Sequence, residues 1–155
     1  MTVGAKPYLI ESDAAGPIRL GMTREQAGKV EGFNVSPATL RLEGSPTSVL
    51  RYERSGEVVA VAELKGGHVS RIRVLSSQFR TPQGGQVGST ARELAKLYGA
   101  GKVFTGKGNA CALFAKAPGL SFCFRTTPQL LQKPDWKKVL MRNPAVEVIL
   151  VIPVK

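Results

Sequence analysis

The stretch Leu20-Gly21-Met22-Thr23-Arg24-Glu25-Gln26-Ala27 decides the fold, because a matching stretch, Val87-Gly88-Ser89-Thr90-Ala91-Arg92-Glu93-Leu94, follows 67 residues later. In each copy a threonine stands three residues before a glutamine or glutamate, the spacing of a capping box that begins a helix. A glycine suited to ending a helix, Gly32 or Gly99, comes nine residues after that threonine. The chain is therefore an internal repeat, and each copy contains a short helix of about two turns.

Three strand-like runs follow each predicted helix. In the first half they are 48–54, 57–65 and 68–75, separated by the hairpin turns Ser55-Gly56 and Gly66-Gly67; in the second half they are 109–116, 120–125 and 146–152. The predicted fold class is α+β, with two tandem units, each a short helix packed on a small antiparallel β-meander. We predict an N-terminal segment at 1–16, a first unit at 17–78 and a second unit at 79–155, with a basic insert at 126–144.

The charge of the chain is uneven. Of its 155 residues, 22 are Lys or Arg and 11 are Asp or Glu, for a formal net charge of +11. Residues 1–78 hold 10 basic and 8 acidic residues, whereas residues 79–155 hold 12 and 3. Such a field favours an anionic partner, which is an acidic protein, a nucleic acid or an anionic component of the cell envelope, and does not decide among them.

Apolar runs in this sequence are short. The longest, 145–154, is interrupted by Glu147 and Pro153, and it falls well below the roughly 20 residues of a membrane helix. We expect no transmembrane segment. Residues 1–8 lack the apolar core of a signal peptide, so the chain is either cytosolic or the mature form of an exported protein that carries an added Met1.

Two cysteines and one histidine limit the chemistry. Cys111, Cys123 and His68 are too few for a structural zinc site. In the run 120–125 the aromatic residues alternate with Cys123, which therefore points away from the core face. If Cys111 shares that outer face, a hairpin centred near Ala117 sets the two cysteines opposite each other and a disulfide forms, which implies an oxidising compartment. Two unpaired, half-buried thiols are the alternative.

Catalytic motifs are absent or incomplete. The run 101–108 has phosphate-loop spacing through Lys107, but it follows a predicted helix and leads into a strand, the reverse of the order in a phosphate loop. His68 follows a hairpin turn, where exposure is expected, and it has no evident nucleophile beside it. We therefore predict no enzyme, no catalytic residue, no metal site and no cofactor.

Arginines alternate with apolar residues in two of the predicted strands. Arg71 and Arg73 flank Ile72, and Arg51 lies between Leu50 and Tyr52. Alternation places these three arginines on the outer face of the sheet, joined by Arg125 from the second unit. This set is the predicted partner-binding patch; an ordinary solvated sheet face is the alternative.

The basic insert holds the single tryptophan. Trp136 is surrounded in sequence by Lys133, Lys137, Lys138 and Arg142, so Trp136 and Lys137 are candidate partner-binding residues. In the alternative interpretation, Trp136 pins the insert to the sheet. Lys102 and Lys107 complete the predicted set as members of a basic loop.

The run 18–27 resembles the helix-start motif shared by the secreted β-lactamase-inhibitor proteins and the small lipoprotein of the outer-membrane β-barrel assembly machinery. The inhibitors contain two such units in tandem, and the run 120–124 is similar to their second unit, in which a cysteine pair links two strands. The resemblance extends from about residue 17 to residue 154. It implies a fold, an exported location and protein binding rather than catalysis. The first unit here lacks cysteine and the surface has few aromatic residues, so no inhibitory activity and no binding residue is transferred.

Taken together, these patterns predict an exported, periplasmic or extracellular, non-enzymatic protein that binds an acidic protein or envelope partner, in the manner of an inhibitor. The alternative is a cytosolic, nucleic-acid-associated basic protein, although the sequence shows no nucleic-acid-binding motif.

Overall fold

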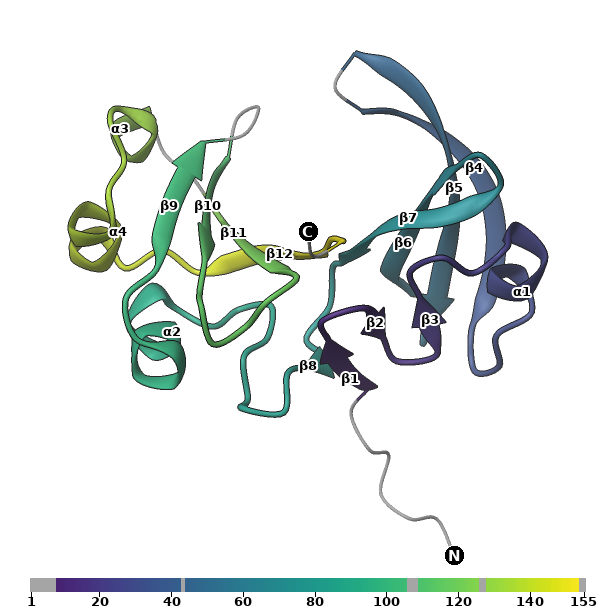
Figure 1. The fold of residues 1–155 in the computed structure, drawn as a ribbon, viewed down its shortest axis with the longest axis horizontal. Coiled ribbons are helices and arrows are strands. Elements are labelled where there is room, and N and C mark those ends of the chain that lie inside the picture. Colours follow the sequence, from purple (N-terminus) through teal and green to yellow (C-terminus); the bar gives the residue numbers. More distant parts are fainter. Residues whose placement is uncertain (1–7, 43, 106–108, 126–127, 154–155) are drawn as a thin grey trace, which may run out of the picture.

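The computed structural model describes residues 8–42, 44–105, 109–125 and 128–153. Its main feature is an eight-stranded sheet with the strand order β4-β5-β6-β7-β12-β11-β10-β9, in which all neighbours are antiparallel (Figure 1). The strands are β4 (Asn34–Leu42), β5 (Ser45–Arg54), β6 (Glu57–Lys65), β7 (His68–Val74), β9 (Lys102–Thr105), β10 (Ala110–Leu113), β11 (Leu120–Phe124) and β12 (Val146–Val151).

A second sheet of four short strands lies below the first in Figure 1. Its strands are β1 (Tyr8–Glu11), β2 (Ala14–Ala15), β3 (Ile18–Arg19) and β8 (Phe79–Arg80), in the order β3-β2-β1-β8, and β1 runs parallel to β8. The helices are α1 (Arg24–Gly28), α2 (Ala91–Tyr98), α3 (Pro128–Leu131) and α4 (Trp136–Arg142). Within the described ranges, every helix is too short or too polar to cross a membrane.

The predicted fold class is wrong. The protein is mostly β, and its strands form one large antiparallel sheet and a second small one rather than two small meanders, each covered by a helix. The large sheet is continuous because β12 pairs with both β7 and β11. This pairing satisfies backbone groups that two separate meanders would leave exposed at their edges.

The sequence patterns predicted neither of the two edge strands of the large sheet, β4 and β9. β4 contains Pro37 and many polar residues, and β9 has only four residues, so neither shows the apolar alternation of a half-buried strand. Both lie at the edges of the sheet, where polar residues and proline are tolerated because one side of the strand needs no partner.

Both predicted capping boxes are confirmed. The Thr23 hydroxyl accepts from the Gln26 N–H at 3.1 Å, and the Gln26 side chain accepts from the Thr23 N–H at 3.0 Å. Thr90 and Glu93 repeat the arrangement at 3.2 and 2.9 Å. Helix α2 ends at Gly99 as predicted, whereas α1 stops at Gly28, four residues before Gly32.

The two predicted hairpin turns are confirmed as well. Both residues of Ser55-Gly56 and of Gly66-Gly67 have positive φ, the conformation of the tight turn that suits the twist of paired strands. Each hairpin also contains a register shift, after Tyr52 in the β5–β6 ladder and after Glu63 in the β6–β7 ladder.

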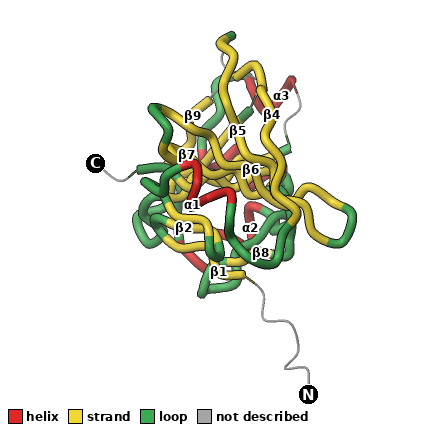
Figure 2. The backbone as a smooth tube through the Cα atoms, turned by 90° about the vertical axis from the view of Figure 1, so that its right-hand side faces the viewer, coloured by secondary structure: helices red, strands yellow, loops and turns green. Residues whose placement is uncertain are grey.

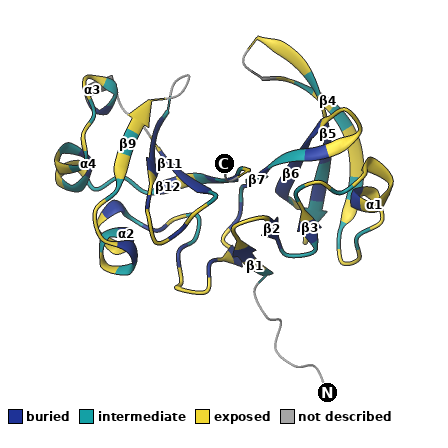
Figure 3. Cartoon of the chain, in the orientation of Figure 1, coloured by how far each residue is buried: buried dark blue, intermediate teal, exposed yellow. Residues whose placement is uncertain are grey.

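The core lies on one face of the large sheet, where one row of paired residues crosses all eight strands. From edge to edge this row is Val35, Tyr52, Ala60, Val74, Ile149, Phe122, Ala112 and Val103. Six of the eight are fully buried, and the two at the edge strands are partly buried (Figure 3).

Tyrosines connect this face to the helices. The Tyr52 hydroxyl donates to the Ala27 carbonyl of α1 at 2.7 Å, and burial raises its pKa above the usual value. Tyr98 of α2 packs on Phe122, with ring centroids 5.6 Å apart, and burial raises its pKa too. Helices α1 and α2 therefore cover the same face of the sheet, one on each half.

Candidate partner-binding surface

The other face of the large sheet, which we call the open face, carries the predicted arginines. It consists of Val49, Arg51, Val61, Glu63, Arg71, Arg73, Ser121, Cys123, Val148, Leu150, Cys111, Leu113, Lys102 and Phe104, which pair across the strands or alternate with the core row. In Figure 1 the two halves of the sheet rise on either side of the β7–β12 pair, so that the open face is concave.

Three of the predicted residues come together there. Arg51 pairs with Val61, and Val61 pairs with Arg73, so the two arginines lie two strand spacings apart in one row, a separation of about 10 Å. Arg71 lies two residues from Arg73 on the same strand and face. The three arginines therefore lie near one another on the same face of the sheet, as their alternation in the sequence predicted.

A buried carboxylate holds two of these arginines in place. Glu63 is only 5% exposed, and Arg71 donates to its two oxygens from Nε at 3.0 Å and from Nη2 at 2.9 Å. Arg73 Nη1 lies 3.5 Å from the same carboxylate. Two-bond pairing of this kind fixes a guanidinium in one orientation.

Arg51 and Arg73 add positive charge to this half of the open face. Arg73 lies 3.5 Å from the carboxylate that Arg71 already binds through two hydrogen bonds, and Arg51 pairs with Val61 on the neighbouring strand. Among the described residues, Arg51 forms no ion pair. The half of the open face on β5, β6 and β7 therefore carries a cluster of arginines, whose guanidinium groups have the geometry to pair with carboxylates.

The other half of the open face is apolar apart from Lys102 at its edge and the buried Ser121. Phe104 and Leu113 are 40% and 37% exposed, which is high for large apolar side chains. Between them and the arginines lie the half-buried Val148 and Leu150 of β12. A partner covering the whole face would thus meet charge on one side and apolar surface on the other, as in interfaces with a mixed core and rim.

A disulfide joins Cys111 and Cys123 within this apolar half. The two residues pair directly between β10 and β11, as the predicted hairpin requires, and both are at most 5% exposed. The alternative of two free thiols is therefore wrong.

The remaining predicted residues lie away from the three arginines. Arg125 is exposed just beyond β11, where its N–H donates to Ala145, at the end of β12 away from Arg71. Lys102 is exposed on the edge strand β9. Lys107 lies outside the described residues.

Trp136 and Lys137 belong to α4, which lies beside β9 in Figure 1. Trp136 packs edge-on against Phe114, with ring centroids 5.4 Å apart, and Phe114 in turn contacts the Phe122 ring of the core row. The tryptophan therefore attaches the insert to the core side of the sheet, whereas Lys137 is exposed. The predicted set is split between the open face and the insert.

Sequence reasoning missed Glu63, Phe104 and Leu113. Glu63 is the one charged residue between Glu57 and Lys65 in a strand of buried apolar residues, and a lone carboxylate in such a run signals a buried ion pair. Phe104 showed no signal, because the edge strand that holds it was not predicted. Leu113 lies two residues from Cys111 in the predicted strand 109–116, so alternation could have placed it on the same outer face.

No known family model matches this chain, and no curated protein sequence matches it. Among solved structures, the fold is similar to the crystal structure of the uncharacterized protein yfeY from Escherichia coli. The similarity has a TM-score of 0.70 at 16% sequence identity, and it covers 94% of this chain and 99% of that chain. The likeness concerns the fold alone.

Proposed function

We propose that this chain is an exported, non-enzymatic binding protein, inhibitor-like in its mode of action, whose open face recognises an acidic protein of the cell envelope. The observation that carries the proposal is the cluster of Arg51, Arg71 and Arg73 around the buried carboxylate of Glu63 on the open face.

An arginine that is held in place favours recognition of carboxylates. Because Glu63 orients Arg71 in advance through two hydrogen bonds, a partner does not have to order this long side chain itself. The exposed Phe104 and Leu113 on the same concave face add apolar area that excludes water from neighbouring charge pairs.

Export is supported by the disulfide. Bonds between cysteines persist in oxidising compartments and are rare in the cytosol. A mass spectrum of the native protein, alkylated with and without prior reduction, tests this part of the proposal. A bridged pair in protein recovered from its own cell is expected; two alkylated thiols would refute export.

The binding surface is tested by a pair of double variants. R51Q/R73Q removes two charges from the open face and leaves the Glu63–Arg71 pair intact, whereas K96Q/K137Q removes two exposed charges from the helices α2 and α4. Urea unfolding first establishes that both variants are folded. Binding partners are then captured from a cell-envelope extract by each protein and identified by mass spectrometry.

We expect the wild type and K96Q/K137Q to retain the same acidic protein, and R51Q/R73Q to bind it about tenfold or more weakly, the equivalent of about 1.4 kcal/mol. Equal losses in the two variants would mean that general charge, and not the open face, holds the partner. Tighter binding of a DNA duplex than of the captured protein, with a steep dependence on salt, would favour the nucleic-acid alternative instead.

A further inference from the structure

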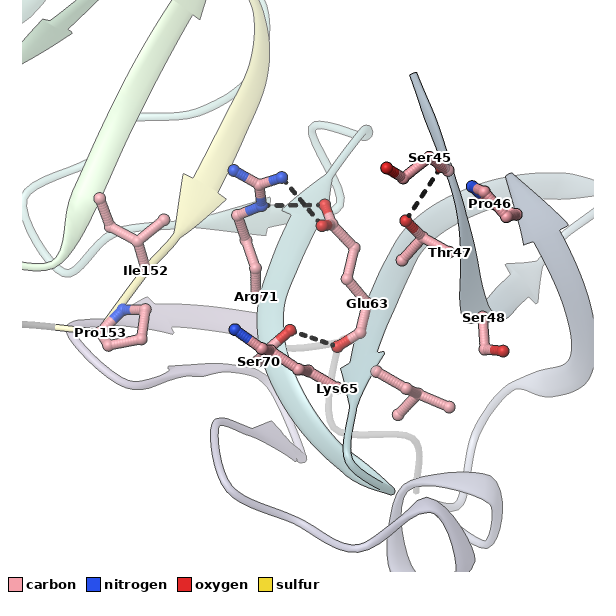
Figure 4. Close-up of a pocket in the computed structure, with 11 residues that line it drawn as sticks. Ser45, Pro46, Thr47, Ser48, Glu63, Lys65, Ser70, Arg71, Ile152 and Pro153 are labelled. Atoms are coloured by element: carbon pink, nitrogen blue, oxygen red, sulfur yellow. Dashed lines mark hydrogen bonds and ion pairs between the residues drawn. The ribbon is translucent and has the colours of Figure 1, made fainter. Parts of the chain in front are cut away.

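A groove opens where strands β5 and β6 separate. The β5–β6 ladder ends at the pair Val49 and Glu63, although β5 begins at Ser45 and β6 continues to Lys65. The register shift after Glu63 in the β6–β7 ladder is the kind of irregularity that bends a strand. The groove has a volume of about 680 Å³, and Figure 4 shows the residues that line it.

One wall of the groove is a strand segment with an open edge. Among the described residues, the segment 45–48 pairs with β4 alone, from Leu42 opposite Ser45 to Thr39 opposite Ser48. In Figure 2 the tip of this hairpin extends beyond the rest of the sheet. A strand with one unpaired side is a template for the addition of another extended chain.

The backbone of this segment offers more acceptors than donors. Pro46 has a carbonyl but no N–H. The Thr47 hydroxyl is turned toward the Ser45 carbonyl, to which it donates at 3.4 Å. An added chain would therefore bind chiefly through its own N–H groups.

The opposite wall is positively charged. Lys65 is exposed at the end of β6 and, within the described part of the chain, forms no ion pair. Glu63 lies in the same wall, but its carboxylate is already bound by Arg71, and Ser70 donates to the Glu63 carbonyl at 3.1 Å (Figure 4). Lys65 and the Arg71–Glu63 ion pair thus line this wall, and the positive charge of Lys65 favours an acidic occupant.

We propose that the groove binds an extended, acidic peptide segment of the partner, which adds as a strand along residues 45–48 and places a carboxylate next to Lys65. This inference rests on the proposed function, because it names the part of the acidic partner that is recognised beside the open face. Strand addition supplies backbone hydrogen bonds that do not depend on sequence, and Lys65 supplies the selection for acidic residues.

A short synthetic peptide in which glutamate alternates with valine and threonine, labelled with fluorescein, is the probe. Binding is measured by fluorescence anisotropy to the wild type, to K65Q and to the matched control K96Q, which removes an exposed lysine of α2. A second peptide of the same sequence carries N-methyl groups on alternate residues, so that it keeps every charge but loses the N–H groups of one edge. A third peptide carries the N-methyl groups on the remaining residues, so that it loses the N–H groups of the other edge.

We expect K65Q to weaken binding about fivefold, the loss of a single charge-assisted contact, and K96Q to leave it unchanged. At least one N-methylated peptide should fail to bind. Amide hydrogen exchange at Thr47 or Ser48 should slow when the unmodified peptide is added. Equal binding of all three peptides, or unchanged exchange throughout 45–48, would overturn the proposal.

The groove and the open face can fail separately. If the peptide does not bind but R51Q/R73Q still loses the captured partner, the groove proposal is wrong and the proposed function stands. If the peptide binds in the groove while R51Q/R73Q retains the partner as the wild type does, the role of the arginines is wrong.

Discussion

Reduction of the disulfide between Cys111 and Cys123 should lower the free energy of unfolding by about 3 kcal/mol. The two cysteines are separated by 12 positions in the sequence, and the loop-closure relation for a cross-link of this length gives about 2.8 kcal/mol at 25 °C. For a chain of this size, such a loss corresponds to a fall in melting temperature of roughly 6–12 °C.

The assay is urea unfolding of the wild type and of C111A/C123A, each with and without a phosphine reductant. We expect the oxidised wild type to be the most stable of the four samples, and the double variant to be insensitive to the reductant. The variant should also be somewhat less stable than the reduced wild type, because both sulfur atoms are buried. A loss of less than about 1 kcal/mol on reduction would refute the argument from loop closure.

Three further predictions concern the ion pair and the second helix. Arg71→Met leaves the buried Glu63 carboxylate with Arg73, at 3.5 Å, as its one ion-pair partner among the described residues, so the free energy of unfolding measured in urea should fall by about 2–4 kcal/mol, and an unchanged free energy would mean that the Arg71–Glu63 pair is solvated. Thr90→Ala removes the hydroxyl that caps α2 and should lower the same free energy by about 1 kcal/mol; an unchanged melting temperature would contradict a role for the cap. The hydrogen bond from the Thr90 N–H holds the pKa of Glu93 below its usual value of 4.5. The ionised Glu93 carboxylate therefore stabilises the fold fully above pH 4.5, and this contribution is lost as the pH falls through the lower pKa of the folded state. Melting curves across this acid range should therefore depend less on pH in Glu93→Gln than in the wild type, and parallel curves would refute the assignment.

The parts of the fold that sequence predicted are those that local chemistry decides. Thr23 and Thr90 begin helices because a hydroxyl and a partner three residues later satisfy free backbone N–H groups. Gly66-Gly67 forms a tight turn because both residues accept positive φ. None of these features needs a contact with a distant part of the chain.

The joining of the sheet could not be predicted in the same way. β7 and β12 meet through three residue pairs, from Ile72 opposite Val151 to Val74 opposite Ile149, and no sequence pattern encodes a pairing across about half of the chain. Apolar alternation marked both strands as half-buried, but alternation does not state which neighbour a strand takes.

The candidate partner-binding surface could be predicted only in part, because strand register also decides which residues meet on it. Alternation placed Arg51, Arg71 and Arg73 on one face. The partner of Glu63 depended on register, because the Gly66-Gly67 turn alone would set Glu63 opposite Ser70. The shift after Glu63 moves it by one residue to Arg71, and a register shift of this kind leaves no mark in composition or periodicity.

The position of β12 also sets the order in which this protein can fold during synthesis. β12 follows every other strand of the large sheet in the chain, yet it lies between β7 and β11 in the middle of that sheet. Until residues 146–151 have left the ribosome, β7 and β11 each lack their neighbour on one side, and unpaired edges of this kind bind chaperones or other unfolded chains. The growing chain therefore cannot close its central sheet until residues 146–151 have been made, so the two halves of the sheet have to wait for the strand that joins them.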